Sequence, residues 1–210
     1  MKHFSPRWFF LFTGGQIMKR LAFLLILLIV LLCPRILVAA EKEMTFRKTT
    51  WGMSFAEVRA SESLKIFKQE KDLLIYKVIV GGKDMMLGYN FIDDQLVMGK
   101  YLLTEVHTNK NDYISDYKDF KKILTKKYGR PKTDEIFWRN ELFKNSHSDW
   151  GRAVSVGHLI YLSTWETPST KIGLALTGDN FKIECFIDYT GKKFVKLIEK
   201  IRDQEKSEPF

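Results

Sequence analysis

The chain has 210 residues and a formal net charge of +9; five basic residues and no acidic residue precede Glu41, which leaves about +4 for residues 41–210. This length suits one domain, or two small domains that share a core. Because lysines are interleaved with acidic residues, as in Lys118-Asp119, and form no concentrated basic stretch, we expect no nucleic-acid partner.

Residues 19–40 have the pattern of a secretory signal peptide. Two basic residues precede an apolar run over residues 21–32, and small residues occupy the −3 and −1 positions before Glu41. The run of twelve residues would cover about 18 Å as a helix, whereas a membrane span needs about twenty residues. We therefore predict cleavage after Ala40 and a periplasmic or secreted protein. The alternative is an inner-membrane anchor formed by uncleaved residues 21–40, which would then be the expected membrane contact.

The residues around the signal support two further predictions. Cys33 closes the apolar run, but Leu32 precedes it where a lipoprotein signal has a small residue, so we predict no lipidation. Gly14-Gly15 can be encoded by a purine-rich run at the spacing of a bacterial ribosome-binding site ahead of Met18. We therefore interpret residues 1–17 as an extension before the true start at Met18. Residues 1–40 are then extension and signal, and residues 41–210 form the exported domain.

The exported part opens with polar residues 41–50, which we predict to be a flexible lead. Ser54 and Glu57 stand at the spacing of a capping box, which predicts a short helix over about residues 55–63. A meander of three antiparallel strands is predicted next, because glycine and aspartate pairs separate segments rich in β-branched and aromatic residues. The expected strands are residues 73–80, 85–92 and 96–105.

A second helix is predicted up to Tyr128, because apolar residues recur every three or four positions. Asn111 or Asp112 can cap its start, and Gly129 and Pro131 end it. The expected strands after it are residues 135–143, 153–164, 172–177 and 182–189, and a last helix is expected over about residues 192–205.

These elements predict an α+β fold with antiparallel sheet and helices packed on one face. The order of helix and then strands occurs twice, which also allows two helix-plus-meander units, divided as residues 51–110 and 111–210. A single larger sheet is the alternative.

Two short motifs resemble those of bacterial families. Trp51-Gly52-Met53-Ser54 followed by Glu57-Val58 has the Trp-Gly-x-Ser-x-x-Glu-Val pattern of many exported bacterial proteins of unknown function. Its Gly-Met-Ser opening also resembles that of the SmpA/OmlA-like outer-membrane assembly lipoproteins, and Gly129-Arg130-Pro131 resembles the Gly-x-Pro that ends a helix in that family. This resemblance implies helices followed by a three-stranded antiparallel sheet. The chain departs from the family in its greater length and in lacking a lipidation cysteine.

The polar segment 105–112 is the richest in candidate site residues. His107 and the carboxylates near it could form an acid–base pair or half of a metal site. No second histidine lies two or four residues away, however, and a strand-to-helix connection that ends in a cap accounts for the segment. We therefore predict no catalytic, cofactor-binding or metal-binding residue. His107 and Asn109 are kept as candidates for a partner or ligand surface.

Tryptophan side chains complete the candidate surface. Trp150 and Trp165 flank the predicted strand 153–164, whose free edge could accept a strand from a partner. Cys185 alternates with large apolar residues and is expected to be a buried, inert thiol.

The sequence thus predicts a non-catalytic binding or accessory module of the bacterial envelope, without a cofactor. Its partner would be an envelope protein or a small envelope ligand. A small exported hydrolase or transferase with a site near His107 is the alternative, and an N-terminally membrane-anchored envelope protein is another.

Overall fold

The computed structural model describes residues 45–207, and the predicted signal and the start at Met18 lie outside these residues. The first half consists of α2 (Phe55–Ser61), β1 (Ile66–Glu70), β2 (Leu73–Val80), β3 (Lys83–Ile92) and β4 (Gln95–Leu103). The second half consists of α3 (Asn111–Tyr128), β5 (Thr133–Trp138), the 3-10 turn η1 (His147–Asp149), α4 (Trp150–Ser155), β6 (Leu159–Glu166), β7 (Thr170–Asp179), β8 (Lys182–Gly191), the 3-10 turn η2 (Lys192–Phe194) and α5 (Val195–Ser207).

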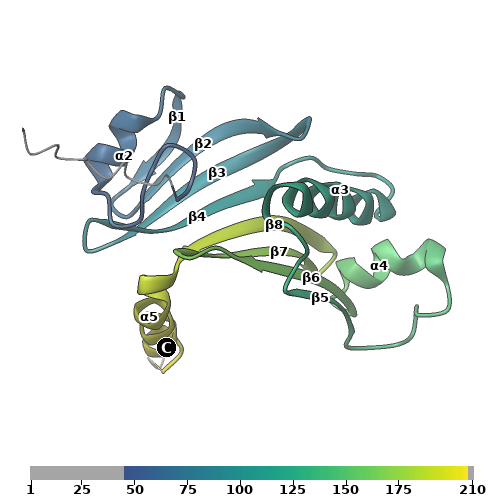
Figure 1. The fold of residues 1–210 in the computed structure, drawn as a ribbon. Coiled ribbons are helices and arrows are strands. Elements are labelled where there is room, and N and C mark those ends of the chain that lie inside the picture. Colours follow the sequence, from purple (N-terminus) through teal and green to yellow (C-terminus); the bar gives the residue numbers. More distant parts are fainter. Residues whose placement is uncertain (1–44, 208–210) are drawn as a thin grey trace, which may run out of the picture. The chain divides into compact units, whose positions relative to one another are not determined.

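The strands of residues 45–207 form one antiparallel sheet of eight strands in the order β1-β2-β3-β4-β8-β7-β6-β5 (Figure 1). Each half is a four-stranded meander, and the two meanders join edge to edge where β4 pairs with β8. This arrangement confirms the predicted α+β class with antiparallel sheet. We call the β4–β8 pair the seam, because side chains from both halves meet over it.

The buried side chains of the strands share one face of the sheet. In β3 alternate residues such as Leu87 and Tyr89 are buried, and the residues between them are half-exposed or exposed. Pairing places Tyr89 beside Gly99 in β4, which in turn lies beside Tyr189 in β8, so the buried row continues across the seam. The buried side chains of α3 and α4 belong to the same core.

The capping box that opens α2 is confirmed. Ser54 Oγ accepts a hydrogen bond from the Glu57 backbone N–H at 3.3 Å, and the Glu57 carboxylate accepts one from the Ser54 backbone N–H at 2.8 Å. The two side chains therefore satisfy amide donors that the first turn of a helix leaves free.

Residues 45–50, which we predicted to be a flexible lead, are packed against the core instead. Phe46 forms an isolated β-bridge with Thr49 and is only 3% exposed. Its ring lies 4.8 Å from that of Tyr189 and 5.6 Å from that of Tyr101, centroid to centroid. The prediction is wrong because one apolar residue among polar neighbours gives no periodic signal.

The predicted strand 153–164 is also wrong at its start, where α4 occupies the first residues. A Cβ on Gly151 would lie 2.2 Å from the carbonyl carbon of Lys110, so only glycine lets α4 approach the start of α3 this closely. Gly157, with φ of +75°, then turns the chain into β6. The run of β-branched residues had favoured a strand throughout.

The cap predicted for α3 is not formed by Asn111 or Asp112. Lys110 stands at the N-cap position without a side-chain hydrogen bond. The Asn111 side chain instead accepts from the Gly151 backbone N–H at 2.7 Å and donates to the Ser148 carbonyl at 2.7 Å. It therefore joins α3 to α4.

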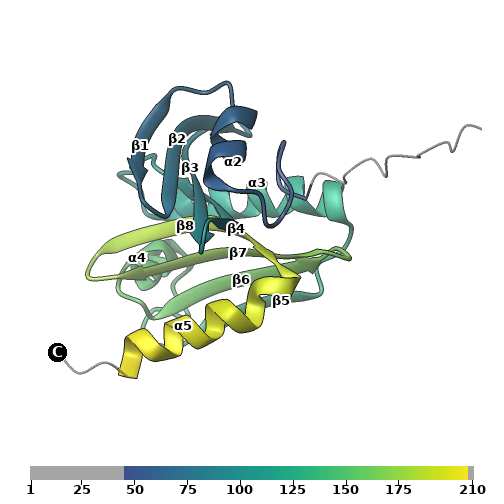
Figure 2. The same ribbon diagram turned by 90° about the vertical axis from the view of Figure 1, so that its left-hand side faces the viewer.

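Helix α5 follows β8 and lies on the opposite side of the β5–β8 strands from α4 (Figures 1 and 2). Its residue Ile198 packs against the core, whereas Leu197 is exposed. Among the helices of residues 45–207, none combines the length and the apolar content needed to cross a bilayer.

Cys185 on β8 is buried at 1% exposure, and burial raises its pKa to about 12. Because the thiolate is the reactive form, we expect the native thiol to react with Ellman's reagent at pH 8 at least about 100-fold more slowly than in the urea-unfolded chain. Absorbance at 412 nm in both states measures this ratio for protein that begins at Glu41. Equal rates would show that β8 opens readily.

Candidate functional site

The connection between β4 and α3 is fixed to the β2–β3 hairpin. The Thr104 backbone N–H and hydroxyl both donate to the Asp84 carbonyl at 3.0 Å. In return, the Asp84 backbone N–H donates to Glu105 Oε1 at 3.0 Å. These bonds orient the Glu105 carboxylate, whose other oxygen is left for further contacts.

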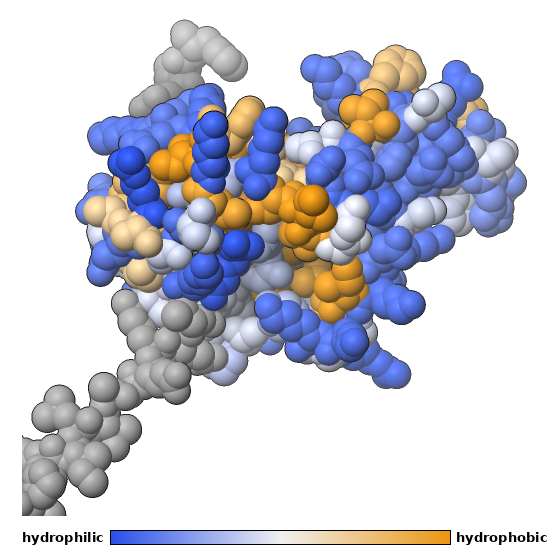
Figure 3. Space-filling view, turned by 90° about the horizontal axis from the view of Figure 1, so that it is seen from above, coloured by the Kyte–Doolittle hydropathy of each residue, from blue (hydrophilic) through white to orange (hydrophobic). Residues whose placement is uncertain are grey.

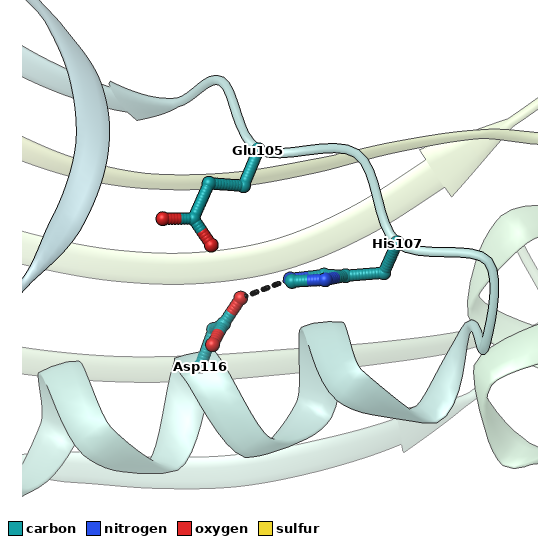
Figure 4. A group of neighbouring side chains, drawn as sticks. All are labelled: Glu105, His107 and Asp116. Carbon is teal, nitrogen blue, oxygen red and sulfur yellow. Dashed lines mark hydrogen bonds and ion pairs between the residues drawn. The ribbon is translucent and has the colours of Figure 1, made fainter.

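Asp116 on α3 is the buried centre of this region, with 2% of its surface exposed. One of its oxygens lies 2.7 Å from Lys83 Nζ, and the other lies 2.5 Å from His107 Nε2. The hydrogen bond to Asp116 raises the pKa of Lys83. The Glu105 carboxylate points toward His107 and Asp116 (Figure 4). Its Oε2 lies 3.8 Å from Lys83 Nζ. We call these four residues the His107 cluster.

Tyr113 holds the backbone of the cluster in place. Its hydroxyl accepts from the His107 backbone N–H and donates to the Glu105 carbonyl, both at 3.3 Å. Its ring also meets the imidazole edge to face, with centroids 4.7 Å apart. The imidazole is therefore held from both sides, by Asp116 and by Tyr113.

A second candidate site is a pocket of about 230 Å³ over the seam. Tyr101 from β4 and Tyr189 from β8 form its buried floor. Residues of the N-terminal bridge, of the last turn of α3 and of the β6–β7 turn surround it. The lining of this seam pocket comprises Thr45, Phe46, Arg47, Tyr101, Lys127, Tyr128, Thr167, Ser169 and Tyr189.

Two cationic side chains line the seam pocket, and one of them is paired with a carboxylate. These are Arg47 and Lys127, and among residues 45–207 no aspartate or glutamate belongs to the lining. The Arg47 guanidinium makes two bonds to Glu62, at 2.7 and 3.2 Å, and one to the Tyr101 hydroxyl at 3.4 Å. Lys127 Nζ lies 5.0 Å from the centre of the Tyr128 ring, and within residues 45–207 no carboxylate is recorded within 4.0 Å of it.

The two tyrosines of the pocket floor, Tyr101 and Tyr189, stay protonated at neutral pH. Burial raises the pKa of Tyr101 and, together with the neighbouring Tyr128, that of Tyr189. Their hydroxyls are therefore available as hydrogen-bond donors and acceptors, and their rings offer flat apolar faces.

The structure separates the residues that the sequence assigned to a partner surface. Trp165 is 1% exposed, and its indole N–H donates to the Gly129 carbonyl at 2.9 Å, so its predicted role at the surface is wrong. Trp150 is half-buried, stacked on His147 and bonded through its indole N–H to the Lys144 carbonyl. Asn109 is exposed, and its side chain accepts from the Asn111 backbone N–H at 3.1 Å at the start of α3.

The predicted free edge is also in a different place. β6, which we expected at the edge, pairs on both sides, and β1 and β5 are the edge strands of this sheet. The sequence placed β6 at the edge because the pairing partner of a strand cannot be read from its own residues.

Comparison of the chain with family models, curated proteins and solved structures finds no match. The resemblance to exported bacterial proteins and to the SmpA/OmlA-like family therefore stays a prediction.

A larger and more apolar hollow of about 530 Å³ lies beside the β2–β3 hairpin, lined by residues such as Leu64, Val78 and Met85. Exposed apolar side chains such as Ile79 occur in the same half, and an apolar patch broken by polar side chains is visible from above (Figure 3). The lining of this hollow is mostly apolar and includes the acidic residue Asp84, whereas the described lining of the seam pocket has three tyrosines and no acidic residue.

Proposed function

We propose that the chain is a non-catalytic binding or accessory module of the bacterial envelope, and that the seam pocket binds its ligand. The observation that carries this proposal is the pocket lining, which combines the unpaired cation Lys127, the Glu62-bound Arg47 and three tyrosines, with no acidic side chain among the described residues of that lining. Such a lining favours a small polar ligand with a negative charge. Export rests on the signal pattern of residues 19–40.

The dimensions of the pocket support a small ligand. Its volume of about 230 Å³ lies below the roughly 300–1,000 Å³ of typical small-molecule sites. A carboxylate at the mouth could pair with Lys127, whose ammonium has no carboxylate partner recorded within residues 45–207. An attached ring could lie against the tyrosines, as sugars do on aromatic side chains.

One observation favours the alternative of an exported hydrolase or transferase, namely the bond between His107 and the buried Asp116. A carboxylate that orients an imidazole is part of many hydrolytic sites. However, among residues 45–207 the recorded hydrogen bonds of the His107 ring include no serine, threonine or cysteine. The proposal therefore remains a binding module.

Intrinsic fluorescence tests this proposal, because Trp51 stacks on the pocket residue Phe46 with ring centroids 6.0 Å apart. We expect glucuronate or N-acetylmuramate to change the emission saturably, and neutral glucose to change it less. Lys127→Met is expected to weaken the binding of the acid about tenfold, which corresponds to about 1.4 kcal/mol.

The matched control is Lys126→Met, which removes the same charge from an exposed residue outside the pocket lining. This control is expected to bind like the unmodified protein. An unchanged emission with every acid, or equal weakening by both substitutions, would contradict the proposed site.

A further inference from the structure

We propose that Glu105, His107 and Asp116 form a binding site for a divalent transition-metal ion such as Zn²⁺, and that the Lys83 ammonium holds the cation position when the metal is absent. This site is separate from the seam pocket and does not depend on the proposed function.

The geometry suits a single ion. One ligand atom from each of the three residues lies within 4.8 Å of the other two. Around a tetrahedral Zn²⁺ the ligand atoms are about 3.4 Å apart, since each lies about 2.0–2.1 Å from the ion. Side-chain movements of about 1 Å, which include separating His107 Nε2 from Asp116 Oδ2 beyond their present 2.5 Å, would therefore place the three atoms in one coordination sphere.

The donor set selects the class of metal. One imidazole nitrogen and two carboxylates match the ligands that proteins use for Zn²⁺ and similar ions, whereas Mg²⁺ and Ca²⁺ prefer oxygen alone. Glu105 and His107 are half-exposed, which leaves access for a water molecule as a further ligand. Asp116 supplies the buried base of the site.

Lys83 shows where a cation is favourable. Its ammonium lies 2.7 Å from Asp116 and 3.8 Å from Glu105, between two negative charges. Its side chain is 27% exposed and comes from the β2–β3 hairpin, so the ammonium can leave to solvent. An ion of charge +2 would then balance the two carboxylates, and Lys83 would compete with it for the same place.

Hydrogen bonds from neighbouring residues orient Glu105 and His107 before a metal ion binds. The Asp84 backbone N–H donates to Glu105 Oε1. The Tyr113 hydroxyl accepts from the His107 backbone N–H and donates to the Glu105 carbonyl. Such outer contacts fix ligand orientation, and their loss typically weakens metal binding about 10–100-fold.

Calorimetry with the untagged exported protein at pH 7 tests the proposal. We expect one Zn²⁺ per chain with a dissociation constant of about 1–10 μM. Co²⁺ should bind with visible absorption bands of a low-symmetry site.

His107→Ala is expected to weaken binding at least about 100-fold, because it removes a ligand. Lys83→Gln is expected to strengthen it about tenfold, because it removes the competing ammonium.

The controls separate a specific site from adventitious binding. His147→Ala removes an exposed histidine outside the cluster and should leave the affinity unchanged. If His107→Ala does not fold, Glu105→Gln must weaken binding and Lys83→Gln must still strengthen it. No binding of Zn²⁺ below 1 mM, equal affinity of the His107→Ala protein, or unchanged affinity after Lys83→Gln would each overturn the proposal.

Discussion

Gly99→Ala is expected to lower the free energy of unfolding by about 3 kcal/mol or more. A Cβ at this position would lie 2.1, 2.4 and 2.5 Å from three ring atoms of Phe46. Because the Phe46 ring is packed between the rings of Tyr89, Tyr101 and Tyr189, it cannot move by a small rotation and would be expelled. Loss of a buried phenylalanine costs about 3–5 kcal/mol. Urea unfolding followed by tryptophan fluorescence measures the change.

Gly173 in β7 provides the matched control, because a Cβ added there meets no atom within 4 Å. Gly173→Ala should leave stability unchanged or increase it by about 0.5–1 kcal/mol, since alanine is less flexible than glycine in the unfolded chain. The double variant Phe46→Ala, Gly99→Ala should be scarcely less stable than Phe46→Ala alone. Additive losses would show that the two residues do not share the contact.

Local patterns were sufficient to predict most elements of the fold. The capping box at Ser54, the glycine turn at residues 81–82 and the periodicity of α3 each act over a few residues, and each is found where the sequence places it. β1 was missed, because its short run Ile66–Glu70 is mostly polar and exposed and so carries no alternating pattern. Helices and strands that are specified by residues close together in the sequence were therefore predictable. A strand without an alternating apolar pattern, such as β1, was not.

The seam pocket was not predictable, because it depends on contacts between distant parts of the chain. Pairing of β4 with β8 brings Tyr101 next to Ile187, and no local signal specifies that pairing. Gly99 offered a partial signal, since a glycine inside a strand often marks the close approach of another group. Nothing in the sequence identified Phe46 as that group.

The His107 cluster was predictable in part. The sequence selected the segment 105–112 and named His107, but expected its carboxylate partner nearby in the same segment. The structure supplies Asp116 from the next turn of α3, and Lys83 from a hairpin tip more than twenty residues earlier. Helical geometry placed Asp116 on the buried face, whereas the approach of the hairpin required the complete fold.

Arg47→Met is expected to lower the free energy of unfolding at pH 7 by about 3 kcal/mol, because it leaves the Glu62 carboxylate buried without its cation. The Glu62 side chain has no exposed surface, and Arg47 binds both of its oxygens. Burial alone would raise the pKa of Glu62, but the hydrogen bonds from Arg47 and Tyr89 outweigh burial and lower it. The pair therefore stabilises the folded chain above the unfolded-state pKa of Glu62, and this contribution is lost as the pH falls through the folded-state pKa.

The substitution should reverse the sign of this pH dependence. Without Arg47, burial dominates and raises the folded-state pKa of Glu62 above its unfolded value. In the variant, the folded chain is then most stable when the Glu62 carboxyl is protonated. The loss of folding free energy caused by ionising Glu62 therefore grows as the pH rises through that raised pKa. The stability difference between the unmodified protein and Arg47→Met should therefore shrink from pH 7 to pH 4 in urea unfolding. Lys48→Met removes a neighbouring exposed charge that acts on Glu62 only through space, so it should show a much smaller loss and no reversal. A difference between the unmodified protein and Arg47→Met that is equal at both pH values would mean that Glu62 does not depend on Arg47 for its charge.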